Sequence, residues 1–224
     1  MEPRIEERKL HELCFNVLPT LKLPVLGSAE TPDTPRAASR KWGERFSRFA
    51  TSLNFFIPNA IPSINSGQEL YEMQPMNLGL DNDETGRYLL PKNDHFYGKL
   101  AFFDNFVMHW QNEDMNHLIE LLSGIRKERI NLIKASNFKK FEQIDSNILA
   151  FIYWNGEKGL LILGNTDFQK QHYVSLNLGY YTWKGEHDIL WLCRDYSCSQ
   201  SPWHTSGTLE INLNPGEFSI AELF

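Results

Sequence analysis

The sequence has few cysteines, no long apolar run and no excess of cations, and each absence excludes a class of protein. Its three cysteines, Cys14, Cys193 and Cys198, are too few for a disulfide framework and favour a reducing compartment. No stretch approaches the roughly 18 apolar residues that a membrane-spanning helix needs, which argues against a membrane protein. Because 22 Lys and Arg face 28 Asp and Glu, the net charge of −6 argues against nucleic acid as a partner.

Targeting and metal-binding signals are also missing from the sequence. Residues 1–9 are mostly charged and no apolar segment follows them, so we expect no signal peptide and a cytoplasmic location. Cys193, Cys198 and His204 lie close together in sequence, but a structural zinc site needs four ligands. We therefore expect neither a metal nor a cofactor.

The composition that remains is that of a globular protein. Hydrophobic residues make up 42% of the chain and charged residues 22%, which is too apolar for a disordered protein. Helix-like stretches alternate with short apolar runs up to about residue 134, whereas short strands separated by turns follow from residue 138. We predict an α/β domain over residues 1–135 and an all-β domain over residues 136–224.

Helical spacing and short apolar runs alternate in the N-terminal part. The predicted helices cover residues 5–18, 38–53 and 113–134, with Asn112 capping the last; the predicted strands cover 23–26 and the apolar run 54–57. Residues 65–109 read as a loop-rich region. Alternating strands and helices indicate a parallel sheet, but two βα units are too few to close a barrel.

Six short strands are predicted in the C-terminal part, and together they indicate an antiparallel sandwich. They cover residues 148–153, 159–163, 173–178, 189–193, 208–213 and 217–222. Asn155-Gly156 predicts a tight hairpin between the first two strands, and Asn214-Pro215-Gly216 a turn between the last two.

Polar side chains follow both predicted strands of the N-terminal part. Glu30, Asp33 and Arg36 follow the first strand, and Asn65, Gln68 and Glu69 follow the second. Because the carboxyl ends of parallel strands line the site in α/β folds, these residues are expected on one rim. The alternative is that Asp33 caps the next helix and pairs with Arg36 at the surface, and that the second loop only covers the sheet end.

These two loops, together with the helix that follows, carry a resemblance to a known family. Leu26-Gly-Ser-Ala-Glu-Thr-Pro-Asp-Thr-Pro-Arg36 and Ala60-Ile-Pro-Ser-Ile-Asn-Ser-Gly-Gln-Glu69 resemble two barrel motifs of the α-amylase superfamily of retaining glycoside hydrolases. Residues 110–134 are similar to the last barrel helix of that family. The resemblance implies the C-terminal portion of such an enzyme: a partial (β/α)8 TIM barrel followed by an antiparallel β-sandwich.

The resemblance also implies a role for Asp33 and, as an orienting residue at most, for Arg36. Asp33 matches the carboxylate that fixes the sugar hydroxyls at the cleavage point and stabilises the transition state. Thr31-Pro32 replaces the usual Asn-His before it, a form that resembles maltosyltransferase-like members. The substrate, an α-glucan or maltooligosaccharide, would be bound by further residues of the two loops: Glu30, Arg36, Asn65 and Glu69.

The two other carboxylates of retaining chemistry are missing from the sequence. That chemistry needs a nucleophile and an acid/base roughly 5–5.5 Å apart, and the chain contains no Gly-x-Arg-x-Asp segment of the family's nucleophile motif. Glu30 and Asp33 could replace the pair only if a sugar fitted between two residues of one loop. We therefore expect a fragment of a hydrolase or transglycosylase, inactive alone, whose missing carboxylates belong to a barrel half encoded upstream.

A second hypothesis from a different class is a non-catalytic carbohydrate-binding or subunit-like protein. It would use the aromatic residues of the C-terminal part as stacking surfaces: Tyr180, Tyr181, Trp183 and Trp203. The same rings could equally pack the sandwich core. A third hypothesis is a degenerate remnant that binds no ligand.

Overall fold

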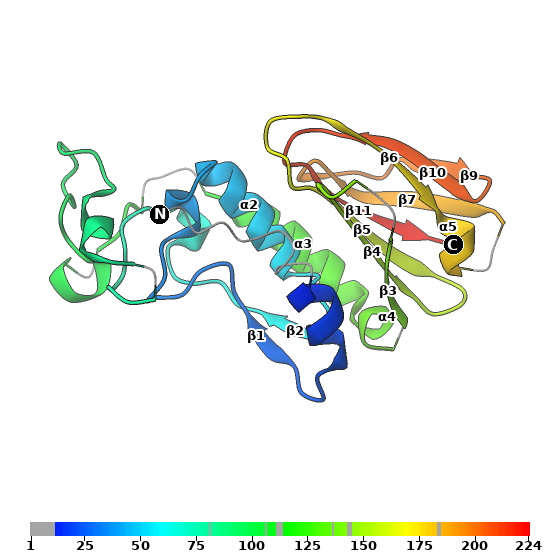
Figure 1. Ribbon diagram of the computed structural model, residues 1–224, viewed down its shortest axis with the longest axis horizontal. Helices are drawn as coiled ribbons and strands as arrows, with labels where there is room; N and C mark the ends of the chain where they lie inside the picture. Colours follow the sequence, from blue (N-terminus) through cyan, green and yellow to red (C-terminus); the bar gives the residue numbers. More distant parts are fainter. Residues whose placement is uncertain are drawn as a thin grey trace. The chain divides into compact units, whose positions relative to one another are not determined.

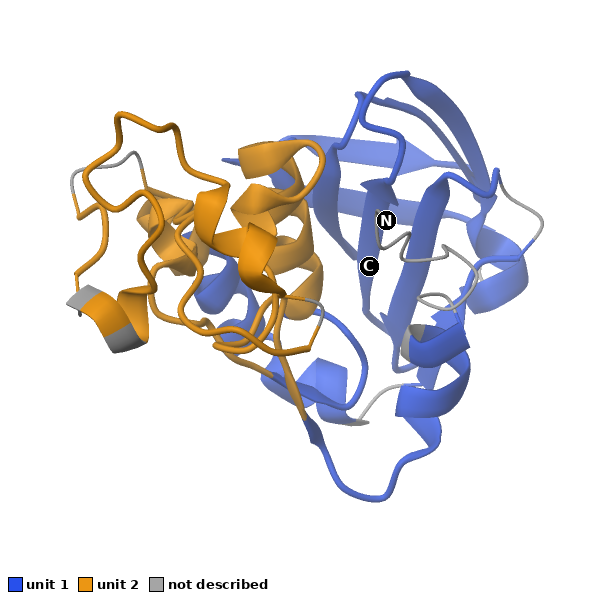
Figure 2. Cartoon of the chain, turned by 60° about the vertical axis from the view of Figure 1, so that its left-hand side comes forward, with its two compact units in different colours: residues 1–25, 55–61, 121–224 blue, residues 26–54, 62–120 orange. Residues whose placement is uncertain are grey.

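The computed structural model describes residues 12–80, 82–105, 107–110, 114–135, 137–142, 145–182 and 185–224 (Figure 1). The chain forms two compact units, each built from separate segments (Figure 2). Unit 1 comprises residues 1–25, 55–61 and 121–224, and unit 2 comprises residues 26–54 and 62–120. The division into two domains at residue 135 stays a prediction from the sequence. The two compact units are each made of separate segments of the chain.

Nine strands of unit 1 form two antiparallel sheets. They are β3 (Asn137–Lys140), β4 (Ile148–Trp154), β5 (Gly159–Asn165), β6 (His172–Asn177), β7 (His187–Arg194), β8 (Ser197–Cys198), β9 (Pro202–Thr205), β10 (Thr208–Leu213) and β11 (Phe218–Leu223). The larger sheet has the order β3-β4-β5-β11-β7-β8, with β9 beside β7, and β10 pairs with β6 in the smaller one. A short helix, α5 (Leu178–Thr182), follows β6.

The core of unit 1 contains buried side chains from both sheets, among them Val174 of β6, Trp191 of β7 and Ile211 of β10. In β10 exposed and buried residues alternate, as expected for a strand with one face in water. Every residue of β4 and β5 is buried, so these two central strands are covered on both faces.

Segments far away in sequence cover the second face of the larger sheet. The Phe15 ring packs 5.3 Å from that of Phe151 on β4, and Phe56 packs 6.3 Å from Phe218 on β11. The Tyr153 hydroxyl donates a hydrogen bond to the Phe56 carbonyl at 2.9 Å. These contacts explain why residues 12–25 and 55–61 belong to the same unit as the β strands.

The six predicted strands of the C-terminal part are all present, with ends that differ by at most two residues. Three strands, β3, β8 and β9, were not predicted; β3 carries two lysines, and the other two are only two and four residues long. The predicted turn at Asn214–Gly216 is confirmed, because it joins the last two strands, β10 and β11. These two strands belong to different sheets, so the turn leads the chain from one sheet to the other.

The N-terminal part contains the expected parallel strand pair with a helix between the strands. Strand β1 (Val25–Gly27), helix α2 (Gly43–Asn54) and strand β2 (Ala60–Pro62) follow one another in the chain. The Val25 amide donates to the Asn59 carbonyl, and the Ser63 amide donates to the Gly27 carbonyl. Because the partners advance together along the two strands, the pair is parallel.

Three boundaries predicted for this part were wrong. The second strand lies at Ala60–Pro62 and not in the apolar run 54–57. Residues 38–53 are not one helix, because positive φ angles at Trp42 and Gly43 separate a 3₁₀ turn from α2. The long C-terminal helix is two helices, α3 (Asn116–Glu128) and α4 (Ile130–Ala135); the predicted cap Asn112 lies outside the described residues. Residues 13–17 form a π-helical turn, and the first part of the predicted helix 5–18 is likewise outside the described residues.

Candidate functional site

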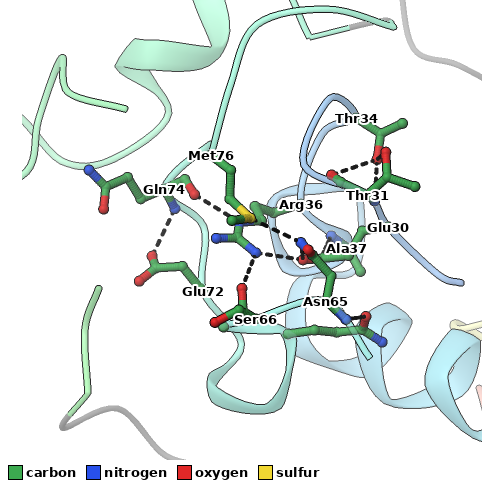
Figure 3. Close-up of polar contacts among 12 residues, drawn as sticks. Glu30, Thr31, Thr34, Arg36, Ala37, Asn65, Ser66, Glu72, Gln74 and Met76 are labelled. Atoms are coloured by element: carbon green, nitrogen blue, oxygen red, sulfur yellow. Dashed lines mark hydrogen bonds and ion pairs between the residues drawn. The ribbon is translucent and has the colours of Figure 1, made fainter. Parts of the chain in front are cut away.

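The loop after β1 contains a buried ion pair between Glu30 and Arg36. The Arg36 Nη1 atom lies 2.7 Å from Glu30 Oε1, and both side chains are only 1% exposed. Arg36 also donates through Nε to the Gln74 carbonyl at 2.8 Å and through Nη1 to the Ser66 carbonyl at 2.7 Å (Figure 3). A buried charge is tolerated when it is paired and hydrogen-bonded in this way. The guanidinium therefore cross-links the loop after β1 to both ends of the segment 66–74.

Both oxygens of the Glu30 carboxylate accept hydrogen bonds from protein donors. Oε1 accepts from Arg36 and from Asn65 Nδ2 at 2.9 Å, and Oε2 accepts from the Ala37 amide at 2.6 Å. The structure thus brings together Glu30, Arg36 and Asn65, from the two loops that the sequence placed on one rim. The alternative of a surface pair between Arg36 and Asp33 was wrong, because Arg36 is buried and its carboxylate partner is Glu30.

Asp33 lies at the tip of the same loop, in a turn stiffened by two prolines. The Thr34 amide donates to the Thr31 carbonyl at 3.2 Å, and the Thr31 amide donates to Thr34 Oγ1 at 2.8 Å. Asp33 is half-buried, and its Oδ1 accepts a hydrogen bond from Asn77 Nδ2 at 2.7 Å. Among the described residues, no donor contacts the second oxygen, Oδ2.

Glu69 and Gln68 hold the second loop, and Gln68 also accepts a hydrogen bond from the Asn65 backbone amide at 3.2 Å. Glu69 Oε2 accepts from the Gly67 amide at 2.9 Å, and the buried Gln68 amide donates to Thr51 Oγ1 of α2 at 2.7 Å. Gly67 has a φ of +90°, and a Cβ there would meet the Met108 sulfur at 2.7 Å. The turn therefore requires glycine, both for its backbone conformation and for the close approach of Met108.

A second polar cluster in unit 2 was not predicted from the sequence, in which residues 65–109 read only as a loop-rich region. The His109 ring lies between two carboxylates, with Nδ1 2.9 Å from Glu72 Oε1 and Nε2 3.2 Å from Asp94 Oδ2. The Glu72 side chain is fully buried and also accepts the backbone amides of Met73, Gln74 and His109, each at 2.8 Å. No periodic pattern marks residues so far apart in the chain, so only the folded structure reveals this cluster.

The two carboxylates decide the charge of His109. Burial opposes a charge on the ring, but the hydrogen bonds and negative charges of Glu72 and Asp94 outweigh it and raise the pKa of His109. Desolvation likewise works against the charge of Asp94, while the Phe96 amide and His109 lower its pKa overall. The ring is therefore stabilised as an imidazolium that donates through both nitrogens.

Solved structures show which fold this arrangement belongs to. Trehalose-6-phosphate hydrolase from Bacillus licheniformis matches with 15% identity and a TM-score of 0.64, over 97% of this chain and 46% of that one. A variant of AmyP in complex with maltotriose matches with 16% identity and a TM-score of 0.59, over 97% and 43%. The α-amylase of H. orenii matches with 14% identity and a TM-score of 0.56, over 89% and 39%.

The chain has the fold of α-amylase-type enzymes. It spans less than half the length of each of these three proteins. It thus holds a partial barrel and a β domain, formed by strands β3–β11, rather than the whole enzyme fold. No protein-family model matches the sequence, and no curated protein matches it. At identities of 14–16%, the likeness establishes the fold and leaves the activity to be argued from the residues.

The aromatic residues in the β domain of this α-amylase-type fold fall into two groups. Tyr181 packs against the core, with its ring 4.3 Å from that of Phe141. Tyr180 is 70% exposed and Trp203 40% exposed, so both present ring surface to water. Trp183 lies outside the described residues.

The remaining predicted features concern metals and membranes. Cys193 and Cys198 are register partners across β7 and β8, and the His204 ring contacts Asp188 at 2.9 Å. Within the described ranges, no group of three His, Cys, Asp or Glu side chains is arranged to hold a metal ion. In the same ranges, no helix has the length and apolarity needed to cross a membrane.

Proposed function

We propose that this chain supplies one side of the active site of a glycoside hydrolase or transglycosylase that acts on α-glucans. The observation that carries the proposal is the placement of Asp33 at the carboxyl end of a parallel strand in an α-amylase-type fold. One carboxylate oxygen is held by Asn77, and no described residue donates a hydrogen bond to the other. The proposal is supported further by AmyP, a structural neighbour of which a variant was solved in complex with maltotriose.

Asp33 would act by binding sugar hydroxyls more strongly in the transition state than in the ground state. Cleavage of a glycosidic bond passes through an oxocarbenium-like state, in which hydrogen bonds from the ring hydroxyls strengthen and contribute several kcal/mol. An anchored carboxylate with one oxygen open to such hydroxyls suits this task. Holding Asp33 by Asn77 also avoids reorganisation of the carboxylate during the reaction.

The other predicted sugar-binding residues divide by their burial. Glu30 and Arg36 are buried with their polar atoms occupied, so we assign them to holding the Asp33 loop in place. Asn65 and Glu69 are only half-buried and are the members of the set placed to meet a sugar. This assignment makes two of the four residues positioning residues rather than ligands.

The nucleophile and the acid/base would come from another segment of polypeptide that completes the barrel. Neither Glu30 nor Asp33 suits a replacement pair, because Glu30 is buried in its ion pair with Arg36. This chain on its own is therefore expected to bind an α-glucan weakly without cleaving it.

Titration of the chain with maltotriose, followed by amide NMR, tests this proposal. We expect shifts at residues 31–36 and 65–69, no hydrolysis, and an affinity about tenfold lower for Asp33→Asn, as expected for losing a hydrogen bond to a charged group. Asp188→Asn, an exposed position in the β domain, is the matched control and should bind as the wild type does. Shifts confined to the β domain, or no binding at all, would contradict the proposal.

A non-catalytic carbohydrate-binding role is the second candidate. It is favoured by the exposed rings of the β domain, Tyr180 and Trp203, together with Tyr173 at 58% exposure. If this candidate holds, Tyr180→Ala and Trp203→Ala weaken maltotriose binding and Asp33→Asn does not. The same titration therefore separates the two functions.

A further inference from the structure

The His109 cluster lies at the two ends of a long chain excursion in unit 2. Glu72 immediately precedes residues 73–108 and His109 immediately follows them, so their contact closes the base of this segment. Asp94 lies inside the excursion and folds back onto the same ring. One imidazole thus joins the start, the middle and the end of the segment.

The excursion also carries the residue that holds Asp33. Asn77 donates to Asp33 Oδ1, and its own side-chain oxygen accepts the Leu78 amide at 2.8 Å, which fixes the orientation of the side-chain amide. The buried Asn82 side chain holds the Asn77 carbonyl, and Gly79 and Asn82 form a β-bridge. A Cβ on Gly79 would lie 3.4 Å from the Asp33 Cβ, so the turn packs directly against Asp33.

We propose that Glu72, His109 and Asp94 form a proton-dependent latch that holds the 73–108 segment, and with it Asn77, against Asp33. The latch makes His109 a positioning residue that acts on Asp33 through Asn77. Its consequence for sugar binding rests on the function proposed above, whereas the latch itself rests on the contacts alone.

The two halves of the latch respond differently when the ring loses a proton. The contact of Nδ1 with the fully buried Glu72 is the shorter one, 2.9 Å against 3.2 Å for Nε2 and the partly exposed Asp94, so Nδ1 keeps its proton toward Glu72. The proton is lost from Nε2, whose lone pair then faces the Asp94 carboxylate 3.2 Å away. Deprotonation therefore opens the contact with Asp94 and leaves the contact with Glu72 in place.

The surroundings of His109 set the direction of the pH dependence. Glu72 and Asp94 face the ring, His95 acts on Asp94, and the Phe96 ring packs edge-on at 4.8 Å. The Arg36 guanidinium, whose charge is balanced by Glu30, contacts the sulfur of Met108, the residue before His109, at 3.7 Å. Because the pKa of His109 is raised on folding, the latch is closed below the pKa of an unfolded histidine and opens as the pH rises through the folded value.

The chain offers a matched control in unit 1. His172 lies between Asp145 at 2.6 Å and Asp167 at 3.1 Å, and the two carboxylates raise its pKa in the same direction. It is far from Asp33 in sequence and holds β-domain loops instead. If the pH dependence of residues 73–108 arises from His109, the His172→Gln variant must keep it unchanged.

The experiment measures hydrogen-exchange protection factors of residues 75–105 and the Asn77 side-chain NMR signals at pH 6 and pH 9. In the wild type we expect protection to fall severalfold at pH 9 and the Asn77 signals to move. His109→Gln should show the low protection at both pH values, and His172→Gln should behave as the wild type. Asp94→Asn keeps the shape of the side chain but removes one of the charges that raise the pKa of His109. The pH at which protection is lost should therefore fall, together with the pKa of His109 that is read from the NMR signals of its ring nitrogens.

Two results would overturn the latch: equal protection at both pH values in the wild type, or an Asp94→Asn variant with an unchanged profile. Asp94→Asn keeps the test decisive if His109→Gln fails to fold. A parallel maltotriose titration separates this inference from the proposed function. Failure of maltotriose to bind at either pH removes the proposed function, while the exchange data still decide the latch.

Discussion

The β strands of unit 1 and the loops of unit 2 are stabilised by different interactions. In the strands, buried apolar side chains such as Leu161 and Trp191 form one continuous core between two sheets. In the loops, buried and half-buried polar groups hold the chain together: the buried Arg36 links three chain segments, and the half-buried His109 joins three points of the 73–108 excursion.

This difference matters for what each region can tolerate. An apolar core accepts many side chains of suitable volume, because dispersion and burial are not directional. A buried charge accepts few replacements, because removal of one partner leaves the other uncompensated. The region that carries Asp33 is therefore the one in which single substitutions have the most specific effects.

The largest effect is expected from removing one partner of the buried ion pair. Arg36→Met leaves the Glu30 carboxylate buried without its counter-charge and should lower the free energy of unfolding by about 3–5 kcal/mol. Urea unfolding combined with amide exchange in residues 27–37 and 62–110 measures this loss. In Glu30→Gln/Arg36→Met the loss should be smaller than the sum of the single changes, and strict additivity would show that the pair does not hold these loops.

The second-largest loss of stability is expected from a core substitution in unit 1. Leu161→Ala on β5 removes a fully buried side chain and should cost about 2–5 kcal/mol, from lost burial and the cavity left behind. Leu80→Ala is the matched control, because Leu80 in unit 2 is 70% exposed; it should change stability by less than about 0.5 kcal/mol. Equal costs at the two positions would contradict the contrast between the regions.

The smallest effect concerns the reactivity of two thiols in unit 1. Burial is the main reason that the pKa of Cys193 is raised to about 12, whereas Cys198 is exposed. At pH 8 we expect iodoacetamide to modify Cys198 quickly and Cys193 only when the β domain opens, because the thiolate is the reactive form. Peptide mass spectrometry separates the sites, and fast labelling of Cys193 in the native protein would show that its strand is not tightly packed.

Sequence patterns predicted the β strands well and the polar site only in part. β4 and β5 were found as apolar runs on either side of the Asn155-Gly156 turn, and β10 as a short strand whose side chains alternate between buried and exposed in the structure. These signals are local, since a strand's periodicity is written in consecutive residues. Helix ends were predicted less well, as at Trp42, where a left-handed backbone conformation breaks an apolar pattern of helical spacing.

The sequence by itself determined that acidic and amide side chains follow two strands, and its motifs placed Asp33 in the first loop. Only the tertiary structure decided that Arg36 pairs with Glu30, that Asn77 holds Asp33 and that His109 joins Glu72 to Asp94. Asn77 lies 44 residues from Asp33, and His109 lies 37 residues from Glu72. Such pairs have no periodic signature, because they meet only when the whole chain has closed the loops between them.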